Sequence, residues 1–371
     1  MNIKDTVRKE LSDIADTVHG GQAWKLEGVE DFSHNLNPYG PPKCLAELIM
    51  KAVAGTDHYP DDNSTEFKDV LSKHFKVGVD NVIAGAGSSD IIRMFPNTFL
   101  GKGDKALIMR PSFAEYAHQC KIAGASVHEL LLKESNDMYV NVNEILANTN
   151  GVKAVYICNP NNPTGRIEPR EKILRIVKEC ADRNILVFLD ETLLELVPSH
   201  GDISCVRYVK EYDNLVVIGS LTKSFAIPGI RIGFGFAGEN AIKAMDKVRM
   251  TWNVGHIEQY VASALIRDHM DHVTKAADMM HSEAKYMHRC LNEIGFKVRT
   301  TDSFFFFNSL NSIGMTVAEF KYKMLSEKIM IRDCGSFGPE FRDHVRFSVK
   351  DRNRNDMFID AVKKVTEGKV K

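Results

Sequence analysis

The sequence SLTKSFAIPGIRIG, residues 220–233, says more about the fold and its chemistry than any other segment of the chain. It places Lys223 among small hydroxyl residues, and Arg231 follows after a loop that contains glycine. A lysine that forms an imine must lose its charge, and a nearby cation favours that loss. Hydroxyl groups and a guanidinium also suit a phosphate. The segment therefore predicts a phosphorylated aldehyde as cofactor, as pyridoxal 5'-phosphate (PLP) is; the alternative is a turn between two strands with a surface lysine.

The composition is that of a globular protein. The 371 residues are 44% hydrophobic and 26% charged, enough for one large or two ordinary domains. The formal charge of −1 gives no electrostatic case for nucleic acid or an anionic membrane as a partner. Basic residues that take part in function must therefore be concentrated locally in a site.

The seven cysteines are scattered, and no two form a C-x-x-C pair. Neither a metal site nor a disulfide framework is expected, and a reduced compartment fits best. The first residues lack an apolar core of signal-peptide length, and the chain has no apolar run of about 18 residues. These observations predict a cytoplasmic protein.

Short apolar runs alternate with amphipathic ones in the middle of the chain, which predicts a parallel sheet covered by helices on both faces. A different pattern after about residue 237 predicts a smaller α+β domain. The expected divisions are an arm at 1–45 that packs with the small domain, a large domain at 46–250 and a small domain at 251–371. The expected strands are near 82 and at 105–110, 126–132, 153–159, 185–191, 214–220 and 230–236, with helices at 89–99 and 171–184.

Several chemically suited residues follow expected strands, and ligands of parallel sheets bind at the carboxyl ends of the strands. Asp190 would hold the pyridine nitrogen of PLP protonated, although a lone Asp is more often a helix cap or a surface charge. The loop NPNNPTG at 159–165 would aim an asparagine N–H at the phenolic oxygen, or is only a tight turn. Phe113 would stack on the ring, or is a core aromatic.

A phosphate site is predicted at residues 85–90, GAGSSD, because small residues at a helix N-terminus expose backbone N–H groups. Ser220, Thr222 and Arg231 would complete it. Arg332 and Arg346 lie in two apolar, strand-like segments, where an unpaired buried charge is costly. They predict an acidic ligand, since the arginine fork suits carboxylate and phosphate; internal salt bridges are the alternative.

The order of four segments resembles that of the fold type I PLP enzymes, the aspartate aminotransferase superfamily, over about residues 19–365. The segments are NPNNPTG at 159–165, LDE at 189–191, SLTKSFAIPGIRIG at 220–233 and VRFSV at 345–349. The resemblance implies a large PLP-binding domain, with a mostly parallel sheet between helices, and a smaller α+β C-terminal domain.

The resemblance also implies roles for individual residues. Lys223 carries the Schiff base, Asp190 pairs with the pyridine nitrogen, and Asn162 meets the phenolic oxygen. Arg346 takes the substrate carboxylate. Tyr59, in HYPD, resembles the tyrosine that reaches the cofactor phosphate of the neighbouring subunit, which implies a homodimer. The implied ligands of the cofactor phosphate are Ser88, Ser89, Ser220 and Arg231.

Two groups within the superfamily compete, the histidinol-phosphate aminotransferases and the L-threonine-O-3-phosphate decarboxylases of cobalamin biosynthesis. His19-Gly20-Gly21, DFSHNLNP at 31–38 and PSFAEY at 111–116 resemble the decarboxylases. Leu193 stands where the aminotransferases have a tyrosine that hydrogen-bonds the phenolic oxygen, and the decarboxylases have Phe there. Leu matches neither pattern, but it agrees with the loss of the hydroxyl. By this resemblance, His19, Asn35 and Arg332 surround a substrate phosphate.

The sequence therefore predicts a PLP-dependent decarboxylase of L-threonine O-3-phosphate or L-serine O-phosphate, with histidinol-phosphate aminotransferase as the alternative. A PLP-sensing transcription regulator is a third possibility, disfavoured by the short N-terminal arm and the charge of −1. The bond that breaks is the one held perpendicular to the cofactor ring. The sequence does not report that torsion, so the choice between lyase and transferase rests on resemblance.

Overall fold

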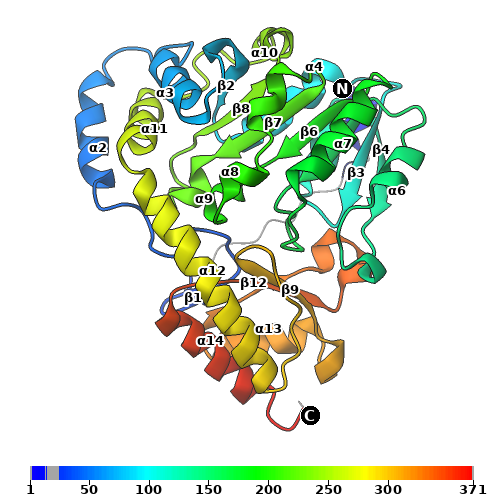
Figure 1. The fold of residues 1–371 in the computed structure, drawn as a ribbon, viewed down its shortest axis with the longest axis vertical. Helices are drawn as coiled ribbons and strands as arrows, with labels where there is room; N and C mark the ends of the chain where they lie inside the picture. Colours follow the sequence, from blue (N-terminus) through cyan, green and yellow to red (C-terminus); the bar gives the residue numbers. More distant parts are fainter. Residues whose placement is uncertain (1, 13, 15–24, 370–371) are drawn as a thin grey trace.

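The computed structural model describes residues 2–12, 14 and 25–369. Figure 1 shows a large sheet with helices in the upper part of the molecule and a smaller unit below it, with the long helix α12 (Met270–Glu293) running from one to the other. Within the described ranges, no helix is long and apolar enough to cross a membrane. The predicted α/β class is confirmed.

The large sheet has seven strands in the order β2-β8-β7-β6-β5-β3-β4. All neighbouring pairs are parallel except those of β8, which is antiparallel to both β2 and β7. In spatial order the strands are β2 (Val82–Gly85), β8 (Gly233–Ala237), β7 (Leu215–Ser220), β6 (Leu186–Asp190), β5 (Ala154–Cys158), β3 (Lys105–Arg110) and β4 (Ser126–Leu131).

Both faces of this sheet are buried except at the edge strand β4, which explains the nearly continuous apolar runs of the other strands. Successive side chains of a strand point to opposite faces. In β5, Ala154, Tyr156 and Cys158 belong to one core cluster, whereas Val155 and Ile157 belong to the other. The parallel strands β3, β5, β6 and β7 therefore end together at one edge, between two packed layers.

Helices cover both faces. The first cluster includes buried residues of α4 (Ser88–Phe99), α5 (Glu115–Ile122) and α10 (Glu239–Asp246). The second includes residues of α3 (Thr65–Phe75), α7 (Arg170–Ala181) and α11 (His256–Asp268). The remaining helices of this part are α2 (Leu45–Ala52), α6 (Val142–Ala147), α8 (His200–Ile203) and α9 (Leu221–Ser224).

The smaller unit contains a three-stranded antiparallel sheet in the order β11-β12-β9, formed by Arg332–Asp333, His344–Ser348 and Phe305–Ser309. The helices α13 (Val317–Ser326) and α14 (Arg352–Val365) pack with α12 around it. Near the N-terminus, α1 is Lys9–Ser12, and β1 (Glu30–Asp31) pairs in parallel with β10 (Ile329–Met330). The expected domain limits at 45 and 250 stay a prediction.

One strand differs from its expected position. The sequence predicts a strand at 230–236, but β8 begins only at Gly233. The guanidinium of Arg231 donates hydrogen bonds to the Pro228 carbonyl and the Ser89 hydroxyl, at 3.1 and 3.4 Å. These contacts hold the residues before Gly233 in a loop that contacts α4. The strand pairing of β8 starts after this loop.

Candidate functional site

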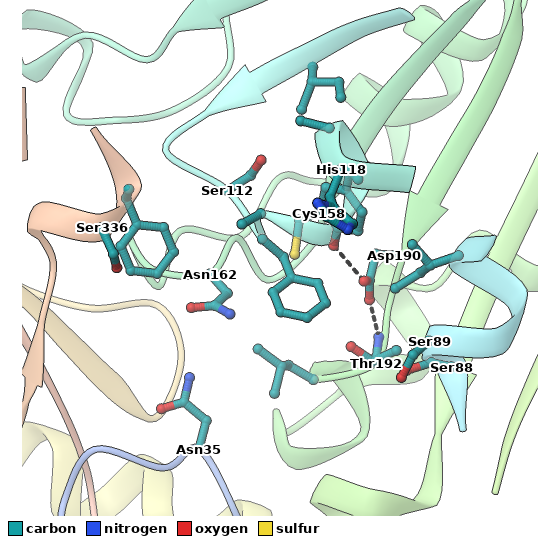
Figure 2. A pocket seen from close by; sticks show the side chains of 18 of the residues that line it. Asn35, Ser88, Ser89, Ser112, His118, Cys158, Asn162, Asp190, Thr192 and Ser336 are labelled. Atoms are coloured by element: carbon teal, nitrogen blue, oxygen red, sulfur yellow. Dashed lines mark hydrogen bonds between the residues drawn. The ribbon is translucent and has the colours of Figure 1, made fainter. Parts of the chain in front are cut away.

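A cavity of about 640 Å³ opens at the carboxyl ends of the parallel strands. It is lined by residues of the large sheet, of the arm before α2 and of the small sheet, and Figure 2 shows part of this lining. Thirteen of the residues singled out from the sequence line it: Asn35, Ser88, Ser89, Phe113, Asn162, Asp190, Leu193, Ser220, Thr222, Lys223, Arg231, Arg332 and Arg346. Residues that are far apart in the sequence thus meet in one cavity; Asn35 and Arg346, for example, are separated by 311 positions.

Lys223 projects from the one-turn helix α9 that follows β7. The side chain of Ser220 begins this helix by accepting a hydrogen bond from the Thr222 N–H at 3.2 Å. Burial, together with the positive charges of Arg346 and Arg231, lowers the pKa of the Lys223 amine from 10.5 to about 8. A substantial share of the amine is therefore neutral near pH 8, which is the form that attacks an aldehyde.

Asp190 ends β6 and is buried. One carboxylate oxygen accepts the Thr192 N–H at 2.9 Å, and the other accepts the Tyr116 hydroxyl at 2.5 Å (dashed lines in Figure 2). Burial raises the pKa of Asp190, while these hydrogen bonds and the charge of Lys223 oppose the rise. The carboxylate is thus held in a fixed orientation beside the cavity.

An anion cradle lies where α4 meets β8. Gly87 has a φ of +80°, and a Cβ there would lie 2.5 Å from a guanidinium nitrogen of Arg231. A Cβ on Gly233 would lie 2.2 Å from the backbone nitrogen of Ser88. Only glycine permits this close packing, which brings the N-terminus of a 12-residue helix, hydroxyl groups and a guanidinium to one wall.

The donor set of the cavity fits PLP. The cradle offers N–H, O–H and guanidinium donors to a phosphate, and Lys223 offers an amine to an aldehyde. Asp190 offers a carboxylate to a ring nitrogen, and Phe113 offers an aromatic face. Each group matches a different part of the same molecule, which is what a cofactor site requires.

Arg346 lies on β12 and is buried. One terminal nitrogen donates to Oδ1 of Asn162, and the other donates to the carbonyl of Ser33 at 2.6 Å. Its Nε has no hydrogen-bond partner among the described residues. Burial lowers the pKa of Arg346 to about 10. Because a guanidinium only donates, it occupies the oxygen of the Asn162 amide and leaves the N–H₂ for another acceptor.

Arg332 lies on β11, directly opposite Arg346 in the antiparallel register. Its guanidinium donates to the Ser336 hydroxyl at 2.9 Å. Asn35 also lines the cavity, and its buried Oδ1 has no hydrogen-bond partner within the described ranges. Two guanidiniums and an amide therefore face the same space, on the side formed by the small sheet and the arm.

Two residues singled out from the sequence remain. His19 lies outside the described residues, so its place in the site stays a prediction, and Tyr59 does not line the cavity. Tyr59 is 72% exposed and stacks on Trp252, with ring centroids 4.1 Å apart. Its expected contact with a neighbouring subunit stays a prediction.

The sequence interpretation missed three features of the site. Tyr116 contacts Asp190, and its only signal was its place in PSFAEY. The buried thiol of Cys158 lines the cavity at the end of β5. The only sign of this position in the sequence was the predicted strand at 153–159. The backbone N–H of Thr192 donates to Asp190, and no sequence pattern indicates this contact.

Comparisons with known proteins agree with this geometry. Residues 27–362 match the family described as aminotransferase class I and II. A histidinol-phosphate aminotransferase of Ruminiclostridium cellulolyticum is 29% identical, over 97% of this chain and 98% of that protein. A Caldanaerobacter subterraneus protein, provisionally named threonine-phosphate decarboxylase, is 31% identical over 94% of each chain. The structure of histidinol-phosphate aminotransferase from Sinorhizobium meliloti in complex with pyridoxal-5'-phosphate has a TM-score of 0.86, at 17% identity and 97% coverage of both chains, and shows the shared fold.

Proposed function

The chain belongs to the aminotransferase class I and II family of PLP-dependent enzymes, and from this premise we propose that it decarboxylates a phosphorylated amino acid. The proposed substrate is L-threonine O-3-phosphate or L-serine O-phosphate, and the product is the corresponding amino alcohol phosphate. The observation that carries the proposal is the cavity wall with Arg332 and Arg346 opposite each other. Two guanidiniums there match a substrate with two anionic groups.

When bound, PLP accepts the electron pair that remains at Cα after bond cleavage. In this proposal Lys223 would hold the aldehyde, Asp190 would pair with the ring nitrogen, and the Asn162 amide would donate to the phenolic oxygen. Phe113 stacks on the ring. The phosphate is held by Ser88, Ser89, Ser220 and Arg231.

The substrate is oriented by groups on the opposite wall. Arg346 binds the carboxylate, because its guanidinium lines the cavity and is held in place by Asn162 and the Ser33 carbonyl. Arg332 and Asn35, together with His19, bind the substrate phosphate. Anchored at both ends, the substrate keeps one orientation about Cα. Lys223 would hold the aldehyde until the substrate amine replaces it, and its freed ammonium group would then be placed to give Cα the proton that takes the place of the departing carbon dioxide.

Leu193 favours decarboxylation over transamination. It is only 5% exposed, lines the cavity and brings no hydroxyl to the position where the aminotransferases carry a tyrosine. Histidinol-phosphate aminotransferase is the second candidate, favoured by the similarity to the Ruminiclostridium cellulolyticum protein over nearly the whole chain.

The test is product identification with threonine phosphate and serine phosphate side by side. We expect carbon dioxide and an amino alcohol phosphate, with no keto acid. A 2-oxoglutarate-dependent half-reaction with histidinol phosphate, without carbon dioxide from either phosphorylated amino acid, would establish the aminotransferase instead. The two phosphorylated substrates differ by one methyl group, so we expect them to differ by only about 1–3 kcal/mol in transition-state binding.

The phosphate role of Arg332 is tested by Arg332→Ala. We expect kcat/KM to fall about 100-fold for phosphorylated substrates, since a hydrogen-bonded charge contributes about 1.5–3 kcal/mol, and to change little for unphosphorylated analogues. Arg342→Ala is the matched control, because Arg342 is an exposed arginine of the same region that does not line the cavity. Equal losses for both substrate classes would contradict the assignment.

A further inference from the structure

Tyr116 has no role in the proposed function, although it is hydrogen-bonded to Asp190. It lies in α5, is 1% exposed, and its hydroxyl is the donor in the 2.5 Å hydrogen bond to Asp190. Its ring lies edge-on to Phe113, with centroids 5.7 Å apart, and also packs on Phe188. One side chain thus contacts both the carboxylate and the aromatic ring that face the proposed cofactor.

The hydroxyl of Tyr116 is the donor in its hydrogen bond to Asp190. Burial and the negative charge of Asp190 raise the pKa of this phenol well above 10, so it keeps its proton. Burial likewise raises the pKa of Asp190, and the Tyr116 hydrogen bond leads the interactions that lower it. A buried carboxylate without such donors would take up a proton itself.

We propose that Tyr116 is a positioning residue, whose hydroxyl keeps Asp190 ionised and aimed so that the shared proton stays on the cofactor ring nitrogen. The inference rests on the proposed pairing of Asp190 with that nitrogen. In the N–H···O pair, a donor to the carboxylate lowers its proton affinity and leaves the proton on nitrogen. Without the phenol the proton shifts toward Asp190, and the ring becomes a poorer acceptor of electrons.

Tyr156 supplies a matched control. It lies on the neighbouring strand β5, is 1% exposed, and its ring centroid is 5.7 Å from that of Tyr116. Its hydroxyl accepts a hydrogen bond from the Cys120 thiol at 3.1 Å and makes none with Asp190. Tyr156→Phe therefore removes a hydroxyl at equal depth from the same aromatic layer and leaves Asp190 untouched.

The experiment compares two cofactors on the apoprotein: PLP, and its 1-deaza analogue, in which C–H replaces the ring nitrogen. Dissociation constants are measured by absorbance titration for wild type, Tyr116→Phe, Tyr156→Phe and Asp190→Asn. For Tyr116→Phe we expect the preference for PLP over the analogue to fall about tenfold, the effect of one hydrogen bond to a charged group. Tyr156→Phe should keep the wild-type preference within about twofold, a change of under about 0.5 kcal/mol.

The outcomes separate this inference from the proposal on which it rests. A preference unchanged in Asp190→Asn would overturn the pairing of Asp190 with the ring nitrogen. A preference that falls in Asp190→Asn but persists in Tyr116→Phe would overturn the role of Tyr116 alone. Equal loss of both cofactors in Tyr116→Phe would show that the hydroxyl supports only the shape of the site, and would also overturn it.

Discussion

The amine of Lys223 should titrate far below an ordinary lysine in the apoprotein, and Arg346 should be part of the reason. Burial is the main cause of the fall in its pKa from 10.5 to about 8, and the positive charge of Arg346 comes next. We therefore choose Arg346→Gln, which removes that charge and keeps a side chain able to hydrogen-bond.

The expected magnitude follows from the two pKa values. A fall from 10.5 to about 8 corresponds to about 3 kcal/mol. At pH 8 about half of the Lys223 amines are neutral, against about 0.3% for an unperturbed lysine. One charge several ångströms away contributes about 1–3 kcal/mol at an effective dielectric constant of about 20. Arg346→Gln should raise the midpoint by about one pH unit, and burial should keep it below 10.5.

The assay is competitive labelling of amines on the apoprotein with fluorodinitrobenzene between pH 6 and 11, read peptide by peptide. Lys350 is an internal reference, because burial and the charge of Arg354 lower its pKa to about 8 without a contribution from Arg346. We expect Arg346→Gln to shift the labelling midpoint of Lys223 and to leave that of Lys350 in place.

Two results would refute this reasoning. A wild-type midpoint of Lys223 near 10.5 would show that the cavity does not suppress its charge. Equal shifts of Lys223 and Lys350 in Arg346→Gln would show a general change in the fold and not the loss of one local charge.

Three further predictions concern packing, pH and assembly. Gly233→Ala should weaken PLP binding at least tenfold in an absorbance titration, because its Cβ would lie 2.2 Å from the Ser88 nitrogen; unchanged affinity would contradict the close packing of the cradle. Burial raises the pKa of Glu195 from 4.5 to about 7, so between these values the unfolded chain loses a proton that the folded chain retains, and stability falls as pH rises. In urea unfolding, Glu195→Gln should be more stable than wild type by about 1–3 kcal/mol at pH 8 and no more stable at pH 4; a variant less stable at pH 8 would contradict this. If the stacked pair of Tyr59 and Trp252 lies in a dimer interface, Trp252→Ala should shift sedimentation toward monomer, and an unchanged dimer would exclude that placement.

Much of the site was predictable because it depends on the carboxyl ends of parallel strands. Asp190 and Ser220 end β6 and β7, which are neighbours in the sheet. A sequence that reveals buried parallel strands therefore reveals which residues meet, even when helices separate them along the chain. Arg332 and Arg346 were noticeable for a related reason, since charged residues in apolar strands need a partner or a ligand.

What the sequence did not reveal depends on distances across the packed layers. The Tyr116 hydroxyl reaches Asp190, which is 74 residues away, and a helical position gives no sign of that contact. The start of β8 at Gly233 depends on where Arg231 turns toward Ser89, and strand propensity alone favoured an earlier start. Both are properties of packing between elements and not of any one segment.

The choice between lyase and transferase also depends on packing between elements and not on any one segment. Arg346 bonds Asn162 and Ser33, which are 184 and 313 residues away along the chain, so three separate segments fix its guanidinium. In the proposed function, where Arg346 binds the substrate carboxylate, the torsion about the substrate Cα would depend on how the small sheet, the arm and the large sheet lie relative to one another. A local motif cannot encode such an arrangement, because the same residues can make the same contacts at slightly different relative positions. Proteins named as aminotransferase and as decarboxylase are both similar to this chain over nearly its whole length, as expected if the reaction depends on such an arrangement.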